Sequence, residues 1–161
     1  MLLQYANYNL WANGLIIECI NAQDETLEDK EVVSSFSSLR KTVYHTWGAE
    51  FIWLQRLKGA EQPIWLPNSF KGTLMTACKL WQDASKGLAI LAEEKDNDGF
   101  TEMIQYNDLK GNMHRSKACD MLQHVFNHST CHRGQIVTML RQLGVNELPS
   151  TDLIAYVRMN S

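Results

Sequence analysis

The sequence predicts an all-α protein: a four-helix bundle with one short β-hairpin before its fourth helix. Four long segments repeat apolar residues with the 3.6-residue period of an amphipathic helix. Links that contain glycine, proline or clustered charge separate these segments. The chain has 161 residues, of which 45% are hydrophobic and 20% charged, a balance that lets one domain bury a core. We therefore expect a single domain over residues 1–161, with the apolar stripes packed together.

The first two helices are expected in the N-terminal part of the chain. The first spans about Leu2–Asn21, and a charged, solvated connection follows it. The second is expected to begin near Ser34 or Ser35, because a serine hydroxyl can cap free backbone N–H groups. It runs to about Lys58. The segment 62–68 contains two prolines and is predicted to be a loop, since proline disfavours helix at the preceding residue.

The remaining elements follow the same reasoning. A third helix is predicted over about Thr73–Lys95, and the turn-forming residues 96–99 end it. Residues 100–112 fit a helix poorly and end in a turn-rich stretch, which favours a short β-hairpin. The fourth helix is predicted over about Lys117–Leu143, and a short tail helix begins near Thr151.

Composition excludes several classes of protein. The net charge is −3 and the sequence pI about 5.9, which argues against nucleic-acid binding, because phosphate contacts need clustered Lys and Arg. No apolar run approaches the roughly 18 residues of a membrane-spanning helix. The N-terminus lacks a basic leader, so we expect a cytoplasmic protein. The cysteines form no CxxC pair and are interpreted as packed or idle thiols in a reducing compartment: Cys19, Cys78, Cys119 and Cys131.

The histidines of the fourth helix carry the functional signal. His128 and His132 stand four residues apart, so both imidazoles lie on one helix face and can converge on one metal ion. A third ligand is needed from elsewhere. His45, in the middle of the second helix, would project toward the bundle interior, and His124 lies one turn before His128. His114, in the predicted hairpin, is expected to be solvated.

The nature of these ligands indicates the kind of site. Neutral imidazole suits Zn, Ni, Fe or Cu, and three histidines leave a coordination position open for water or substrate. The competing interpretation is that no metal binds, because histidines four apart also arise by chance and a core histidine is usually hydrogen bonded. Gly134, inside the helix, is interpreted as a point of close helix contact, since glycine otherwise costs a helix about 1 kcal/mol.

Several segments together resemble the DinB-like family, which is also grouped with the YfiT-like metal-dependent hydrolases. The resemblance covers almost the whole chain, and the fourth-helix segment is its most specific part. The matching segments are Tyr8–Asn13, His45 with Trp47 and Glu50, His128–Gln135, and the tail Pro149–Tyr156.

The family resemblance implies a topology, a set of metal ligands and several activities that the apolar periodicity alone does not. It implies an up-down-down-up bundle in place of a simple antiparallel one, and it maps the ligands onto His45, His128 and His132. The implied cofactor is one divalent metal ion, with Zn or Ni expected first and Fe or Mn as alternatives. Homodimers are common among members of the family. Some are transferases that use low-molecular-weight thiols, others are hydrolases or isomerases, and many have no known activity.

Two functions follow from these observations. The first is a metal-dependent transferase or hydrolase that activates a thiol or water for attack on a small-molecule substrate. In it Gln135, one turn beyond His132, would orient a ligand, while Glu50 and Asp120 are candidate bases on charge alone. The second is a non-catalytic stress-related binding protein with a structural metal.

Three tryptophans are expected in the core, although they could also line a pocket: Trp47, Trp53 and Trp65.

Overall fold

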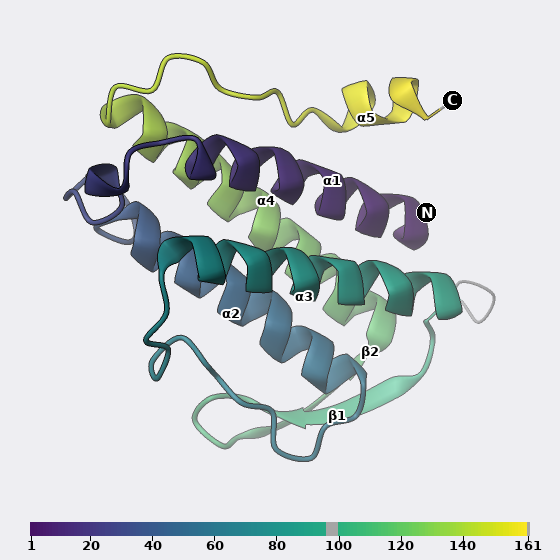
Figure 1. Cartoon of the computed structure of the whole chain (residues 1–161). Helices are drawn as coiled ribbons and strands as arrows, with labels where there is room; N and C mark the ends of the chain where they lie inside the picture. The colour runs from purple at the N-terminus through teal and green to yellow at the C-terminus, as the bar shows by residue number, and fades with distance from the viewer. Residues whose placement is uncertain (96–99, 161) are drawn as a thin grey trace.

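A computed structural model describes residues 1–95 and 100–160 and confirms the predicted fold class (Figure 1). Four long helices pack side by side, a two-stranded hairpin lies at one end of the bundle, and a short helix follows the C-terminal tail. The helices are α1 (Leu2–Asn21), α2 (Leu39–Leu57), α3 (Leu74–Glu94), α4 (Ala118–Gln142) and α5 (Leu153–Met159), with a 3₁₀ turn, η1 (Glu25–Leu27), and strands β1 (Met103–Asn107) and β2 (Met113–Lys117).

The bundle has up-down-down-up topology. In Figure 1, α1 and α4 run in one direction while α2 and α3 run in the other. The closest contacts arrange the helices round the bundle in the order α1, α3, α2, α4, so that α2 packs against both α3 and α4. Because α2 and α3 are parallel, the segment 58–73 must return along the bundle to connect them.

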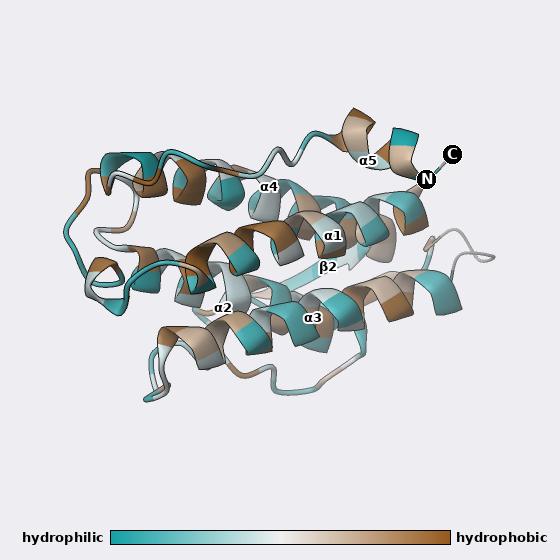
Figure 2. Ribbon diagram, turned by 45° about the horizontal axis from the view of Figure 1, so that its top comes forward, coloured by the Kyte–Doolittle hydropathy of each residue, from teal (hydrophilic) through white to brown (hydrophobic). Residues whose placement is uncertain are grey.

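The core is built from the apolar faces of all four long helices. Brown and teal segments alternate along these helices in Figure 2, as amphipathic helices require. One buried cluster surrounds Trp47 and Trp81 toward one end of the bundle, and a second surrounds Leu88 and Phe126 toward the hairpin. In the described part of the chain, no helix is long and apolar enough to cross a membrane.

Helix α2 begins later than the sequence predicted. Its N-cap is Ser38, whose side chain accepts a hydrogen bond from the backbone N–H of Lys41, and the predicted start near Ser34 or Ser35 is wrong. The preceding residues form a turn in which the Val32 N–H donates to the Ser37 carbonyl. Several serines in a row offer equivalent caps, and the tertiary contacts of the turn decide which one is used.

The elements after α2 fall close to their predicted positions. Thr73 caps α3, and the hairpin pairs Met103 with Lys117 in antiparallel register. Helix α3 ends at Glu94 with Lys95 as its C-cap, which confirms the predicted end near Lys95, while the predicted turn residues 96–99 lie outside the described residues. Gly144 adopts φ +92° just after α4, the left-handed conformation that ends helices, and the tail then returns along α1.

Two glycines in helices have opposite surroundings. A Cβ added at Gly48 would overlap Pro67 and lie 2.9 Å from Trp65 Cη2, so this glycine lets the 58–73 connection pack on α2. A Cβ at Gly134 would meet nothing within 4 Å. The predicted close helix contact at Gly134 is therefore wrong: the residue is exposed on the outer face of α4, where glycine has no packing role.

Substitution by alanine should change the free energy of unfolding in opposite directions at these two glycines. We expect Gly48→Ala to lower the free energy of unfolding by about 1–3 kcal/mol, because overpacking displaces the connection. Gly134→Ala should raise it by up to about 1 kcal/mol through helix propensity alone. Urea denaturation of both variants checks the pair, and destabilisation by Gly134→Ala would contradict the open surroundings described above.

Candidate metal centre

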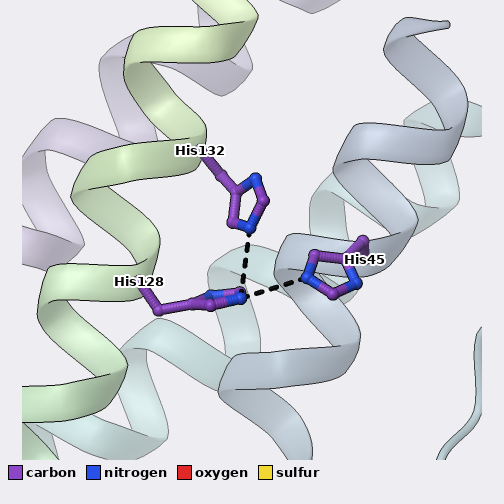
Figure 3. A group of neighbouring side chains, drawn as sticks. All are labelled: His45, His128 and His132. Atoms are coloured by element: carbon purple, nitrogen blue, oxygen red, sulfur yellow. Dashed lines mark hydrogen bonds between the residues drawn. The ribbon is translucent and has the colours of Figure 1, made fainter. Parts of the chain in front are cut away.

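Three imidazole rings from two helices point at one another between α2 and α4 (Figure 3). The Nε2 atom of His128 lies 3.0 Å from Nε2 of His45 and 3.1 Å from Nε2 of His132. One ligand atom from each histidine lies within 4.8 Å of the others. The structure therefore brings together the three histidines that the family resemblance implied.

Helix geometry explains the convergence. Residues four apart on a helix project from the same face one turn apart, which places the rings of His128 and His132 at a centroid distance of 4.3 Å. Helix α4 packs against α2, and His45 lies near the middle of α2, so its ring reaches both from the facing helix. His45 and His128 are partly buried and His132 is buried, at 8% exposed.

The cluster fits a divalent metal ion. Tetrahedral coordination with Zn–N bonds of about 2.0–2.1 Å places ligand nitrogens about 3.3 Å apart, close to the two observed separations. Nε2 of His128 is shared between its two neighbours, while its buried Nδ1 has no hydrogen-bond partner among the described residues. Each neutral imidazole carries only one N–H, so the converging nitrogens cannot all be hydrogen bonded to one another. A cation at the point where they converge would accept their lone pairs instead.

A hydrogen bond fixes the orientation of His132. Its Nδ1 lies 2.8 Å from Oε1 of Gln135, an acceptor, so Nδ1 carries the proton and Nε2 directs its lone pair into the cluster. The amide of Gln135 in turn donates to the hydroxyl of Ser35 at 3.0 Å. The prediction that Gln135 orients a ligand thus has a geometric basis, and the turn before α2 takes part in it.

The surroundings keep these imidazoles neutral. The pKa of His45 is lowered to about 4, mainly by burial and to a smaller extent by the charge that His132 can carry. The pKa of His128 is lowered to about 3, mainly by burial and also by the charges that the neighbouring histidines can carry. The pKa of His132 is also lowered by burial, against a smaller opposing effect of the Gln135 hydrogen bond. Neutral imidazole is the form that binds metals, so the rings are ready as ligands near pH 7.

Aromatic side chains flank the cluster on the side of the loops. The ring of Phe36 lies 4.5 Å from that of His45 and 5.9 Å from that of His132, measured between centroids. Trp65, from the connection between α2 and α3, contacts His45 edge-on at 5.8 Å. Both aromatic residues are half-buried, so they offer apolar surface beside the three nitrogens.

The other two histidines lie outside the cluster. His124 is exposed on α4; its ring lies 4.9 Å from that of Trp53 and 6.1 Å from that of His128. His114 is exposed on β2, as predicted, where it stacks on Tyr106 and lies 3.2 Å from the carboxylate of Asp108.

Neither residue named as a base on charge alone finds support. Glu50 is fully buried and its carboxylate accepts hydrogen bonds from core side chains, so the prediction that it acts as a base is wrong. Asp120 is exposed in the first turn of α4, two turns before His128. Of the three tryptophans expected in the core, Trp47 is buried there, whereas Trp53 and Trp65 are half-buried. All four cysteines are free thiols.

Sequence reasoning missed Phe36 and Ser35 at the site. Both lie in the turn before α2, which the sequence assigned to the start of that helix. A chain without regular structure leaves no periodic signal, so their proximity to the histidines emerges only from the fold. An aromatic residue among serines was the one local indication.

The fold and site together define a class: a four-helix bundle with a three-histidine cluster between two of its helices that could hold a metal ion. Comparison with known proteins is more specific. The DinB family model matches residues 1–160, and the chain belongs to the DinB family. It is also similar to the protein DinB of Bacillus subtilis (strain 168), with 25% identity over 157 residues, 94% of this chain and 91% of that protein.

Solved structures show the same fold. A DinB-like protein from Bacillus cereus ATCC 10987 superposes with a TM-score of 0.68 and 16% identity, covering 92% of this chain and 94% of that chain. A DinB-like protein from Bacillus subtilis gives a TM-score of 0.69, also at 16% identity, with 92% and 97% covered. These likenesses establish the bundle architecture.

Proposed function

We propose that this protein is a metal-dependent transferase or hydrolase whose three-histidine site activates a thiol or a water molecule. The observation that carries the proposal is the convergence of His45, His128 and His132 through their Nε2 atoms. Three protein ligands leave a coordination position for a small molecule, whereas structural sites are usually closed by four. Zn or Ni is the metal we propose first, because imidazole suits both.

The chain's own residues supply binding and orientation. A divalent cation at the site would lower the pKa of a water or thiol and so make a nucleophile available near neutral pH. His132 is held in the required tautomer by Gln135, which Ser35 anchors. Phe36 and Trp65 offer apolar contact to an electrophilic substrate and restrict the access of bulk water.

A low-molecular-weight thiol is proposed as one substrate and a homodimer as the assembly, both on the family resemblance. The runner-up function is a stress-related binding protein in which the metal only fastens α2 to α4.

Metal-loaded protein should turn over an electrophile that the metal-free protein does not. The test loads the protein with Zn, Ni or Mn, supplies several thiols or water alone, and follows loss of an electrophile that carries an apolar group. Removal of one ligand in His45→Ala should lower kcat/KM at least about 100-fold, since even residues that only support a ligand cost 10–100-fold. His114→Ala is the matched control, because that histidine lies outside the cluster. Rates equal to those of metal-free protein in every combination would favour the structural metal.

A further inference from the structure

A fully buried carboxylate lies at the centre of the bundle. Glu50 is 0% exposed, and its Oε1 accepts hydrogen bonds from the side-chain amides of Asn9 at 3.0 Å and Asn13 at 2.8 Å. The hydroxyl of Ser129 donates to the same oxygen at 2.6 Å, and that of Ser85 donates to Oε2, also at 2.6 Å. These donors offset the cost of removing a charged group from water.

The matching positive charge is Arg133, which is 2% exposed. One nitrogen of its guanidinium, Nη1, donates to the amide oxygens of Asn9 and Asn13 at 2.6 and 2.7 Å. The two asparagines therefore bridge a buried carboxylate and a buried guanidinium, donating to one and accepting from the other. The guanidinium also lies over the ring of Tyr8, 5.4 Å from its centroid.

We call this group the polar node. It joins all four long helices, and its members are Asn9 and Asn13 on α1, Glu50 on α2, Ser85 on α3, and Ser129 and Arg133 on α4. Stability alone does not account for it, because buried charges replaced by well-packed apolar residues often leave a protein as stable or more so. Such a group instead fixes how the helices are positioned relative to one another, because hydrogen bonds require specific distances and angles while apolar packing does not.

Residues of the polar node stand at fixed sequence positions relative to the histidines on α4 and α2. On α4, Ser129 directly follows His128 and Arg133 directly follows His132. Adjacent helical residues are 100° apart, so α4 turns the histidines toward α2 and their successors toward the bundle centre. On α2, Glu50 follows His45 by five residues and occupies the centre from the opposite side. The hydrogen bond from Ser129 to Glu50 therefore ties the two ligand-bearing helices directly behind the cluster.

We infer that the polar node is the positioning device of the three-histidine cluster: it sets the rotation and the height of α4 against α2, so that the Nε2 atoms converge before a metal arrives. This inference rests on the proposed function, because it assigns Glu50, Ser129 and Arg133 a role toward a bound metal. They are positioning residues, since none of them belongs to the cluster itself.

Cobalt(II) binding by the intact chain tests the inference without any assay of activity. The variants are Glu50→Gln, which keeps the shape and removes the charge, and Ser129→Ala, which removes one hydrogen bond. We expect Glu50→Gln to raise the Co²⁺ dissociation constant about 10-fold or more and to change the visible absorption bands that report coordination geometry. Ser129→Ala should raise it less, by about threefold, because it removes only one of the four hydrogen bonds that Glu50 accepts. All measurements are made well below the unfolding midpoint of each metal-free variant.

A stability-matched control separates positioning from mere destabilisation. Leu91→Ala removes a buried side chain of α3, the long helix next to α2 that carries no histidine, six residues beyond Ser85. It should lower the unfolding midpoint yet keep the wild-type dissociation constant and spectrum. If Glu50→Gln does not fold without metal, as judged by far-UV circular dichroism, Ser129→Ala carries the same test.

The outcomes are distinguishable. Node variants with the wild-type dissociation constant and spectrum overturn the inference and leave the metal site intact. An equal loss of affinity in Leu91→Ala also overturns it, because global stability would then explain the effect. A wild-type protein that takes up no Co²⁺ overturns the proposed function, and the role of the node with it.

Discussion

Replacement of His128 by alanine is expected to abolish stoichiometric metal binding. This ring is the centre of the cluster, because its Nε2 lies within 3.1 Å of the corresponding atoms of both His45 and His132. Its removal leaves two nitrogens on different helices. We expect the dissociation constant to rise by more than about 100-fold, beyond the 10–100-fold typical of residues that only support a ligand. Elemental analysis of purified protein gives the metal content directly.

The control for this experiment is His124→Ala. That histidine lies one turn earlier on the same helix, is exposed, and packs against Trp53 outside the cluster. The control should retain the metal content of the wild type, which also decides whether His124 serves as a further ligand. Equal metal content in His128→Ala and the wild type would remove the site, whatever the behaviour of the control.

The second large effect is a loss of stability of the metal-free protein in mild acid. A histidine in the unfolded chain titrates near its ordinary pKa of 6.5, whereas burial holds the pKa of His45 at about 4 and that of His128 at about 3. Between these values the unfolded chain binds more protons than the folded one, so stability rises with pH. The stabilisation is complete above about pH 6.5 and is lost progressively as the pH falls toward 4.

Urea denaturation at pH 7 and pH 5 measures this effect. Each of the two histidines should contribute a loss of about 1–2 kcal/mol over that interval, after allowance for solvent screening of the partly exposed rings. A variant with both histidines replaced by glutamine should show a flatter dependence. A wild-type unfolding free energy that is the same at both pH values would contradict the buried, neutral state of the cluster.

Much of the bundle was predictable from local pattern. The four long helices and the hairpin follow from apolar periodicity and turn residues, and the predicted pair on α4 is fixed by helix geometry alone. The third histidine was not fixed in this way. His45 and His128 are 83 residues apart, and only the packing of α2 on α4 brings them to 3.0 Å.

The polar node shows where local reasoning stops. Asn9 and Asn13 stand four apart within an apolar helix, a spacing that marks one face as polar, yet nothing local says what faces it. Glu50 was named as a candidate base on its charge alone, and its complete burial could not be predicted because burial is a property of the fold and not of the residue. The interpretation of Gly134 was wrong because a glycine within a helix indicates close helix contact only where another element packs against it, and a Cβ at Gly134 would meet nothing within 4 Å.

The parallel course of α2 and α3 has a consequence for what the protein can recognise. The 58–73 connection between these two helices must run back along an outer face of the bundle. There it places Trp65 beside His45 and Pro67 against Gly48. This wall of the site therefore belongs to a connection and not to the helices that hold the histidines. Selectivity for the incoming molecule can change by exchange of residues in this return segment, while the helical frame and its nitrogens stay as they are.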